Sequence, residues 1–203
     1  MKRKFRLTLL IMIGLLGVLG TFQPAAAQTE PGQGLALVLN AEGPLTPVMV
    51  SYIERSLDIA RQDSADLIVI QLNTPGGSIS LMNEIIQILR SSEIPIVIYV
   101  TPRGAMAGSA GTLITLAGHA SAMAPETTIG AASPVGSQGE DIGETMEAKE
   151  KEILRATVRS LAARRPPEAI DLAEDTIQNA KAASSSEALD VGLVDFIAAD
   201  LND

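Results

Sequence analysis

The sequence predicts a single α/β domain, in which helices pack against a mostly parallel sheet. Strand-like and helix-like segments alternate along the chain, as in sheets whose neighbouring strands are joined by helices. The strand-like segments are almost continuously apolar, which is typical of strands covered on both faces. With 203 residues, of which 46% are hydrophobic, the chain can bury one substantial core and has little room for a second.

Each element is predicted from its local pattern. Strands are expected over residues 35–39, 67–72, 96–100, 120–124 and 193–198. Helices are expected over residues 47–62, 81–90, 113–117 and 144–164. Thr46 and Pro47 suit the start of the first helix, and Pro166-Pro167 should end the long one. Residues 184–187 match a capping box and predict a further short helix.

The N-terminus has the pattern of a secretory signal peptide. Basic residues at positions 2–6 precede an apolar stretch over 9–19 and three alanines at 25–27. We therefore expect a leader over residues 1–27, a polar linker over 28–34 and one domain over 35–203. The alternative is that the leader is retained as a membrane anchor, although its apolar stretch is short for a span.

Composition excludes several classes of function. The chain has no cysteine and a single histidine, His119, so it can form neither a disulfide framework nor a zinc site with several histidines. The formal net charge is −9 and only 2% of the residues are aromatic. This composition argues against nucleic acid as a partner, and no motif predicts a cofactor.

Two glycine-rich turns, each after a predicted strand, are the natural places for a site. The turn 73–77 could leave backbone N–H groups free to stabilise an oxyanion, because glycine permits unusual dihedrals and close approach. The turn 104–112 places Ser109 before an apolar helix, whose N-terminus favours negative charge. Taken alone, the turn 73–77 fits a simple tight turn as well as an oxyanion site. Ser109, taken alone, fits a helix cap or a small residue at a packing contact better than a nucleophile.

Together, the segments resemble the membrane-bound serine proteases of the NfeD family, the type that partners stomatin-like proteins. The resemblance covers residues 35–199 and rests on these segments: 73–77, 99–105, 107–112, 123–125, 129–132, 159–162 and 187–195. It implies the Clp-protease/crotonase-like fold, a mostly parallel sheet of repeated ββα-type units. It also implies cleavage of apolar peptide segments by a Ser-Lys dyad, with stomatin-like membrane proteins as substrates, and a homodimer or higher homo-oligomer.

The resemblance assigns roles to five residues. Ser109 occupies the nucleophile position and Lys149 the general-base position, while Gly76, Gly77 and Ala110 belong to the oxyanion and substrate-binding turns. A lysine that acts as a base must be neutral, whereas the reference pKa of a lysine is about 10.4. Desolvation is the physical means of favouring the neutral amine. We therefore expect apolar surroundings for the base.

A helical projection separates the two lysines nearest the base position. At about 100° per residue, Lys149 shares one face with four other residues, and this face is predicted to be buried: Met146, Ile153, Thr157 and Ser160. Lys151 points to the opposite side, where it can pair with Glu147. His119 lies in a segment that resembles the family's structural helix-to-strand connection, so it is not expected to be catalytic.

Two other readings use the same scaffold. One is a crotonase-like acyl-CoA enzyme, which would stabilise an enolate with the same backbone N–H groups; the predicted export and the lack of an evident acid pair near the turns argue against it. The other is a non-catalytic pseudoprotease or binding module. The presence of both Ser109 and Lys149 favours the protease over that reading.

Overall fold

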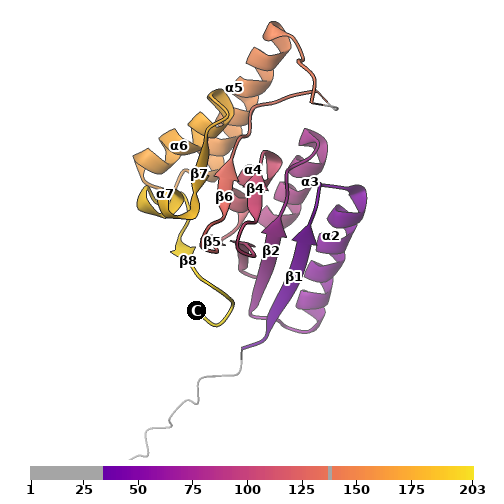
Figure 1. Ribbon diagram of the computed structural model, residues 1–203. Helices are drawn as coiled ribbons and strands as arrows, with labels where there is room; N and C mark the ends of the chain where they lie inside the picture. The colour runs from indigo at the N-terminus through magenta and orange to yellow at the C-terminus, as the bar shows by residue number, and fades with distance from the viewer. Residues whose placement is uncertain (1–33, 137–138) are drawn as a thin grey trace, which may run out of the picture. The chain divides into compact units, whose positions relative to one another are not determined.

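The computed structural model describes residues 34–136 and 139–203. The predicted signal peptide over 1–27 and nearly all of the predicted linker lie outside these residues. The main sheet has the order β1 (Ala36–Glu42), β2 (Leu67–Asn73), β3 (Ile96–Val100), β5 (Ala120–Met123) and β8 (Phe196–Ile197), as Figure 1 shows. Every neighbouring pair in it is parallel. The predicted α/β fold with a mostly parallel sheet is therefore confirmed.

A second, smaller sheet contains strands that the sequence did not predict. It has the order β4 (Met106–Gly108), β6 (Thr128–Gly130) and β7 (Ala182–Ser184). The first pair is parallel and the second antiparallel. These strands have only three residues each and are rich in alanine and glycine, so they lack the alternating or β-branched pattern by which strands are recognised.

Helices pack on the main sheet and flank the small one. They are α2 (Pro47–Gln62), α3 (Ile79–Arg90), α4 (Ala110–Ala117), α5 (Glu144–Leu161), α6 (Pro167–Gln178) and α7 (Ser185–Asp190). The predicted start of α2 is confirmed, since the Thr46 hydroxyl accepts a hydrogen bond from the Met49 N–H at 3.2 Å. The capping box of Ser184 and Glu187 is also present. None of the helices within the described ranges has the length and apolarity needed to span a bilayer.

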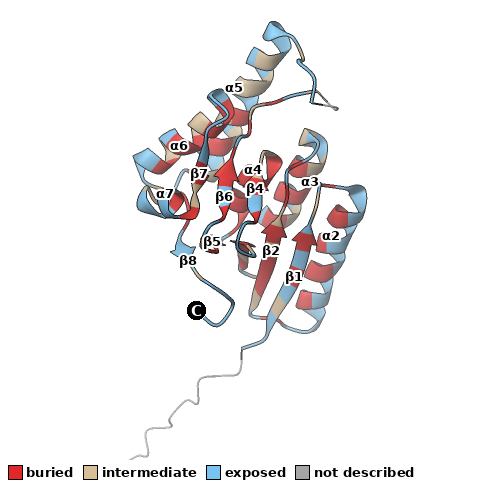
Figure 2. Cartoon of the chain, viewed as in Figure 1, coloured by how far each residue is buried: buried red, intermediate tan, exposed pale blue. Residues whose placement is uncertain are grey.

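Helix α4 lies at the centre of the molecule. All eight of its residues are buried, and Figure 2 shows its neighbours lined with buried positions as well. Its side chains are small or aliphatic apart from two threonines, and the Thr112 and Thr115 hydroxyls donate to backbone carbonyls. Because α4 is packed on all sides, its N-terminus is held in a fixed position.

The C-terminal end differs from the prediction in two places. The long helix stops before Pro166-Pro167 as predicted, at Leu161, but Pro167 is also the first residue of α6, a helix that was not predicted. Proline suits this position because the first N–H of a helix has no partner to lose. The strand expected over 193–198 is reduced to Phe196–Ile197, because the residues before it take part in a loop anchored by Asp195.

Asp195 ties the C-terminal loop to the main sheet. Its carboxylate accepts hydrogen bonds from the Ser121 N–H at 2.8 Å and the Ser121 hydroxyl at 3.0 Å. Arg165 adds an ion pair at 3.0 Å. Burial alone would raise the pKa of Asp195, but the hydrogen bonds from Arg165 and Ser121 outweigh it and hold the pKa below its ordinary value.

Replacing this carboxylate should lower the free energy of unfolding at neutral pH. It should also make that free energy depend less on pH in acid. Because the folded pKa is depressed, Asp195 stabilises the fold above its unfolded pKa of about 3.9, and this contribution is lost as pH falls through the folded pKa. We expect Asp195→Asn to lower the free energy of unfolding at pH 7 by about 1–2 kcal/mol. Urea denaturation at several pH values measures this, with the exposed Asp58→Asn as control. An equal loss at pH 7 and pH 2 would show that the charge is not responsible.

Candidate active site

The two glycine-rich turns meet at Thr74, which is completely buried. Its N–H donates to the carbonyl of Met106 at 2.8 Å, and its carbonyl accepts from the N–H of Gly108 at 2.9 Å. The turn after β2 is thereby joined to β4, the strand that leads into Ser109. The two segments that the sequence singled out are therefore brought side by side.

Ser109 stands between β4 and α4 in an unusual backbone conformation. Its φ and ψ are 51° and −120°, a region that residues with a side chain seldom adopt. The Ser109 N–H donates to the Gly130 carbonyl at 2.8 Å, which helps to hold this conformation. The hydroxyl does not cap α4, and within the described residues it makes no hydrogen bond. Backbone strain of this kind is typical of functional positions.

Two backbone N–H groups beside Ser109 have no hydrogen-bond partner within residues 34–136 and 139–203. They belong to Gly77 and to Ala110, the first residue of α4. The N–H of Gly76, in contrast, donates to the Thr74 hydroxyl at 3.0 Å. Gly76 instead permits close approach: its φ is +109°, and a Cβ there would lie 2.7 Å from the Cβ of Ser109. Gly77 and Ala110 are thus the available donors for an oxyanion.

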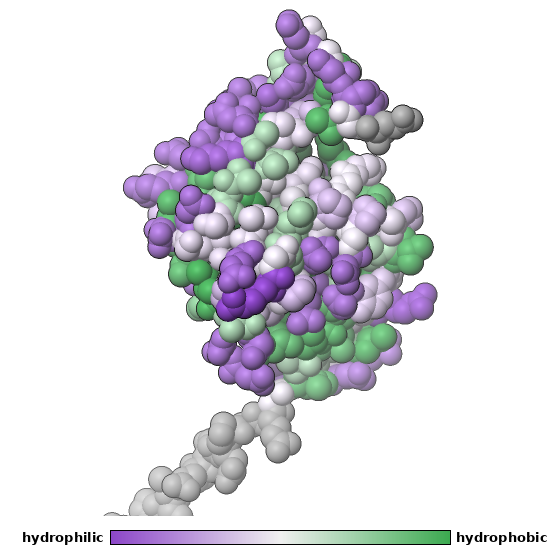
Figure 3. Space-filling model, in the orientation of Figure 1, coloured by the Kyte–Doolittle hydropathy of each residue, from purple (hydrophilic) through white to green (hydrophobic). Residues whose placement is uncertain are grey.

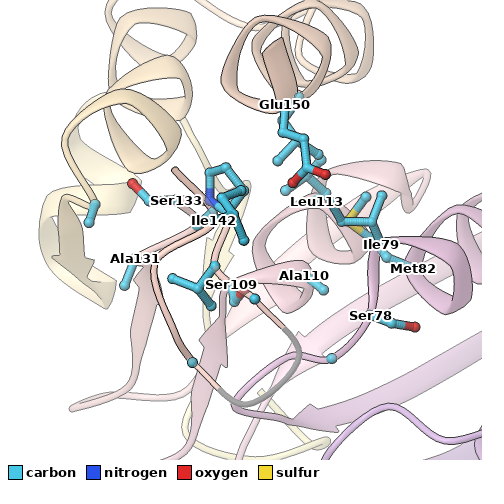
Figure 4. A pocket seen from close by; sticks show the side chains of 18 of the residues that line it. Ser78, Ile79, Met82, Ser109, Ala110, Leu113, Ala131, Ser133, Ile142 and Glu150 are labelled. Atoms are coloured by element: carbon cyan, nitrogen blue, oxygen red, sulfur yellow. The ribbon is translucent and has the colours of Figure 1, made fainter. Parts of the chain in front are cut away.

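A cleft of about 810 Å³ opens beside Ser109. Figure 4 shows how its side chains surround Ser109. Most of its larger side chains are apolar: Ile79, Met82, Leu113, Val135, Ile142 and Leu154. The charged residue among its described lining is Glu150, whose carboxylate extends from α5 toward Leu113 and Ile79. The cleft can therefore accept a long side chain whose methylene groups are apolar.

The predicted buried face of α5 was wrong. The residues of α5 that are buried are Leu154 and Val158, whereas Met146 is 51% exposed and Ile153 is 65% exposed. Only the C-terminal half of α5 packs on the body of the molecule, and its first turns project beyond it (Figure 1). On the face shown in Figure 3, the surface over α5 and α6 is largely hydrophilic. The stripe that packs is therefore offset from the one we predicted.

This offset decides where the candidate base lies. Lys149 is exposed, and it does not belong to the lining of the cleft that holds Ser109. Its assignment as base stays a prediction. Lys151 forms the expected ion pair with Glu147, at 2.6 Å. Sequence reasoning missed Glu150, although a signal was present: Glu150, Leu154 and Val158 recur at the helical spacing of four and so share one face.

His119 lies apart from Ser109, in a second cleft with Arg164 and Arg165. Its Nδ1 accepts a hydrogen bond from the Ile96 N–H at 3.1 Å. Partial burial, together with the nearby charges of Arg90 and Arg164, lowers the pKa of His119. No group of three or more His, Cys, Asp or Glu side chains in the described part of the chain is placed to bind a metal ion.

Known proteins are similar to this chain in sequence. Residues 38–199 match the family model of the NfeD1b N-terminal domain. The chain is 37% identical over 173 residues to the membrane-bound protease PH1510 of Pyrococcus horikoshii, covering 84% of this chain and 39% of that protein. It is 35% identical over 130 residues to the membrane protein NfeD1b of Bacillus subtilis, covering 64% and 28%. The chain thus spans well under half the length of these relatives.

Solved structures agree with the fold. The N-terminal domain of the Pyrococcus protease, called stomatin-specific and solved as a lysine-to-alanine variant with a substrate peptide, superposes with a TM-score of 0.76 at 34% identity. The match covers 84% of this chain and 78% of that one. ClpP1 of Listeria monocytogenes superposes with a TM-score of 0.65 at 18% identity, covering 81% and 92%, which supports a Clp-protease-like fold. The chain therefore belongs to the NfeD1b N-terminal domain family.

Proposed function

We propose that the chain is a serine endopeptidase in which Ser109 is the nucleophile and Lys149 the general base. One observation carries the proposal: the Ser109 hydroxyl stands at a strained position beside the N–H groups of Gly77 and Ala110, and none of these three groups has a hydrogen-bond partner among the described residues. This is the arrangement that acyl transfer requires, because a nucleophile and an oxyanion site must lie next to each other. The relatives described as proteases support the same chemistry.

The reaction would proceed in two halves. Ser109 Oγ attacks the scissile carbonyl as its proton passes to the base, and the N–H groups of Gly77 and Ala110 donate to the oxygen that becomes negative. Collapse of this intermediate breaks the peptide C–N bond, and the amine leaves with the proton. Water then hydrolyses the acyl ester and restores the serine. The N-terminus of buried α4 adds positive potential where the negative charge develops.

The spacing of two substituted residues in the Pyrococcus domain supports a lysine on α5. One solved variant of that domain lacks a serine and another lacks a lysine, at positions 41 residues apart. In this chain Lys149 lies 40 residues after Ser109 and Lys151 lies 42 after it. Lys151 is already paired with Glu147. Lys149 is not engaged in any ion pair within the described residues, so we assign it as the base.

Lys149 is exposed in the single chain, so a further surface must desolvate its amine before it can act as the base. A base must shed its own proton first, and water stabilises the charged ammonium. Met146 and Ile153 flank Lys149 on the same helical face, and both apolar side chains are at least half exposed. We propose that a second copy of the chain packs on this face and desolvates the amine. Burial of this exposed apolar area would favour that association.

The remaining parts of the proposal concern substrate and place. The apolar walls of the cleft suit apolar peptide segments, and stomatin-like membrane proteins are the proposed source because the Pyrococcus domain is described as specific for stomatin. The leader over residues 1–27 would direct export, and a retained leader would tether the domain to the membrane. An acyl-CoA enzyme has less support, since the relatives that are named for an activity are proteases.

Ser109→Ala should reduce peptide hydrolysis by about 10³-fold or more, because no other group can form the acyl ester. The change removes one half-buried hydroxyl that caps nothing, so circular dichroism should show an unaltered fold. The measurement is cleavage of an apolar peptide library by the full chain, analysed by mass spectrometry. Ser91→Ala, at an exposed serine of the α3 terminus, is the control. Full activity in Ser109→Ala would refute the assignment of the nucleophile.

Lys149→Ala should abolish turnover, whereas Lys151→Ala should retain most of it. The second change breaks only a helical ion pair, worth about 0.5 kcal/mol or less. Initial rates of peptide hydrolysis and thermal unfolding of both variants should be compared under identical conditions. If activity disappears in Lys151→Ala alone while both variants are folded, the base is Lys151. The spacing from the serine to the base would then be one residue longer here than in the Pyrococcus domain.

Gly76→Ala should disturb the site far more than Gly43→Ala. Both glycines have positive φ, +109° and +94°, but a Cβ at Gly43 meets nothing within 4 Å. Each change costs about 1–3 kcal/mol of backbone strain, while only the first displaces Ser109. We expect a lower unfolding midpoint in both variants, with the larger decrease in Gly76→Ala because its Cβ would clash with Ser109, and a loss of turnover in Gly76→Ala alone. Equal turnover in the two folded variants would contradict the close packing of the turns.

A further inference from the structure

Glu150 places a negative charge in a cleft that is otherwise lined by apolar and uncharged polar residues. It is the charged member of the described cleft lining, and it is half-buried. Its carboxylate has no ion pair and no hydrogen bond within residues 34–136 and 139–203. The nearest acids along α5 are satisfied, because Glu147 pairs with Lys151 and Glu152 with Arg155. Glu150 therefore differs from its neighbours in having no partner.

The packing of α5 sets the side of the helix from which Glu150 projects. Glu150 lies one turn before Leu154 and two turns before Val158, the two buried residues of α5. The packing of those residues fixes the face of the helix and turns Glu150 toward the cleft. Figure 4 shows its carboxylate near Leu113 and Ile79, on the other side of the cleft from Ala131 and Ser133.

A half-buried carboxylate is stabilised by a cation or by hydrogen-bond donors that bind beside it. Removing a charge from water costs free energy unless an opposite charge or hydrogen-bond donors compensate. Apolar walls beside it suit the methylene stem of a long basic side chain, which can bury its carbons while its charged end reaches a partner. Lysine and arginine are the residues that combine such a stem with a terminal cation.

We propose that this cleft selects a lysine or arginine side chain, and that Glu150 is the residue that determines this specificity. The selected residue would contribute the carbonyl that Ser109 attacks, because the cleft adjoins Ser109 directly. This inference rests on the proposed endopeptidase function, because it concerns the substrate of that enzyme. The binding of a peptide can nevertheless be measured without turnover. It narrows the substrate from an apolar segment to an apolar segment interrupted by one basic residue.

The test uses fluorescent peptides that are identical except at one residue, which is lysine or norleucine. Norleucine keeps the methylene stem and lacks the ammonium, so the pair isolates the charge. Binding is measured by fluorescence anisotropy with the full chain carrying Ser109→Ala, which retains the cleft. We expect the lysine peptide to bind about tenfold more tightly, because its ammonium can pair with the Glu150 carboxylate. Adding Glu150→Gln should bring the two peptides within about twofold.

Glu144→Gln is the matched control, because it removes the same charge from the first turn of the same helix, outside the cleft lining. It should preserve the preference for lysine. Equal binding of the two peptides, tighter binding of norleucine, a preference that survives Glu150→Gln, or no binding of either peptide would each overturn the proposal.

Hydrolysis by the unsubstituted chain separates this inference from the proposed function. If the lysine preference depends on Glu150 in binding but no peptide is cleaved, the specificity stands and the endopeptidase proposal fails. If peptides are cleaved but Glu150→Gln leaves the ratio of rates for lysine and norleucine unchanged, the endopeptidase stands and the specificity fails.

Discussion

The pairing of the turn after β2 with β4, through the buried backbone of Thr74, is the constraint on which the site depends. Two hydrogen bonds of 2.8 and 2.9 Å join Thr74 to Met106 and Gly108, and its hydroxyl holds Gly76. A charged or large residue could not occupy this completely buried position. The N–H of Gly77 and the strained Ser109 lie next to each other because this one residue connects the segments that carry them.

Long elements were predictable from the sequence because their patterns are redundant. The continuous apolar runs of β2 and β3, and the Thr46 cap of α2, each specify structure locally. The small sheet was not predictable, because β4, β6 and β7 exist through pairing between distant short segments. Ser109 was found for a related reason: a run of small residues before an apolar helix is a local signal, although its strained φ depends on Gly130 across the sheet.

Helix α5 shows where pattern reasoning reaches its limit. Its sequence carries two candidate stripes, one through Met146 and Ile153 and another through Leu154 and Val158. Periodicity cannot choose between them, because both recur at helical spacing. Packing of the C-terminal half against the rest of the molecule selects the second. That choice exposes the first stripe and brings Glu150, which shares the face of Leu154 and Val158, into the cleft.

The two residues of the proposed dyad are therefore held in different ways. Ser109, with the N–H groups of Gly77 and Ala110, is fixed by backbone pairing inside the chain, so the nucleophilic half needs no partner to take shape. The base belongs to a helix whose first turns project into solvent, and Lys149 is exposed there. Water stabilises a charged ammonium relative to a neutral amine. In the proposed enzyme, therefore, whatever covers the exposed stripe of α5 controls the supply of a neutral amine, and catalytic competence is governed by association and not by the fold of the serine site.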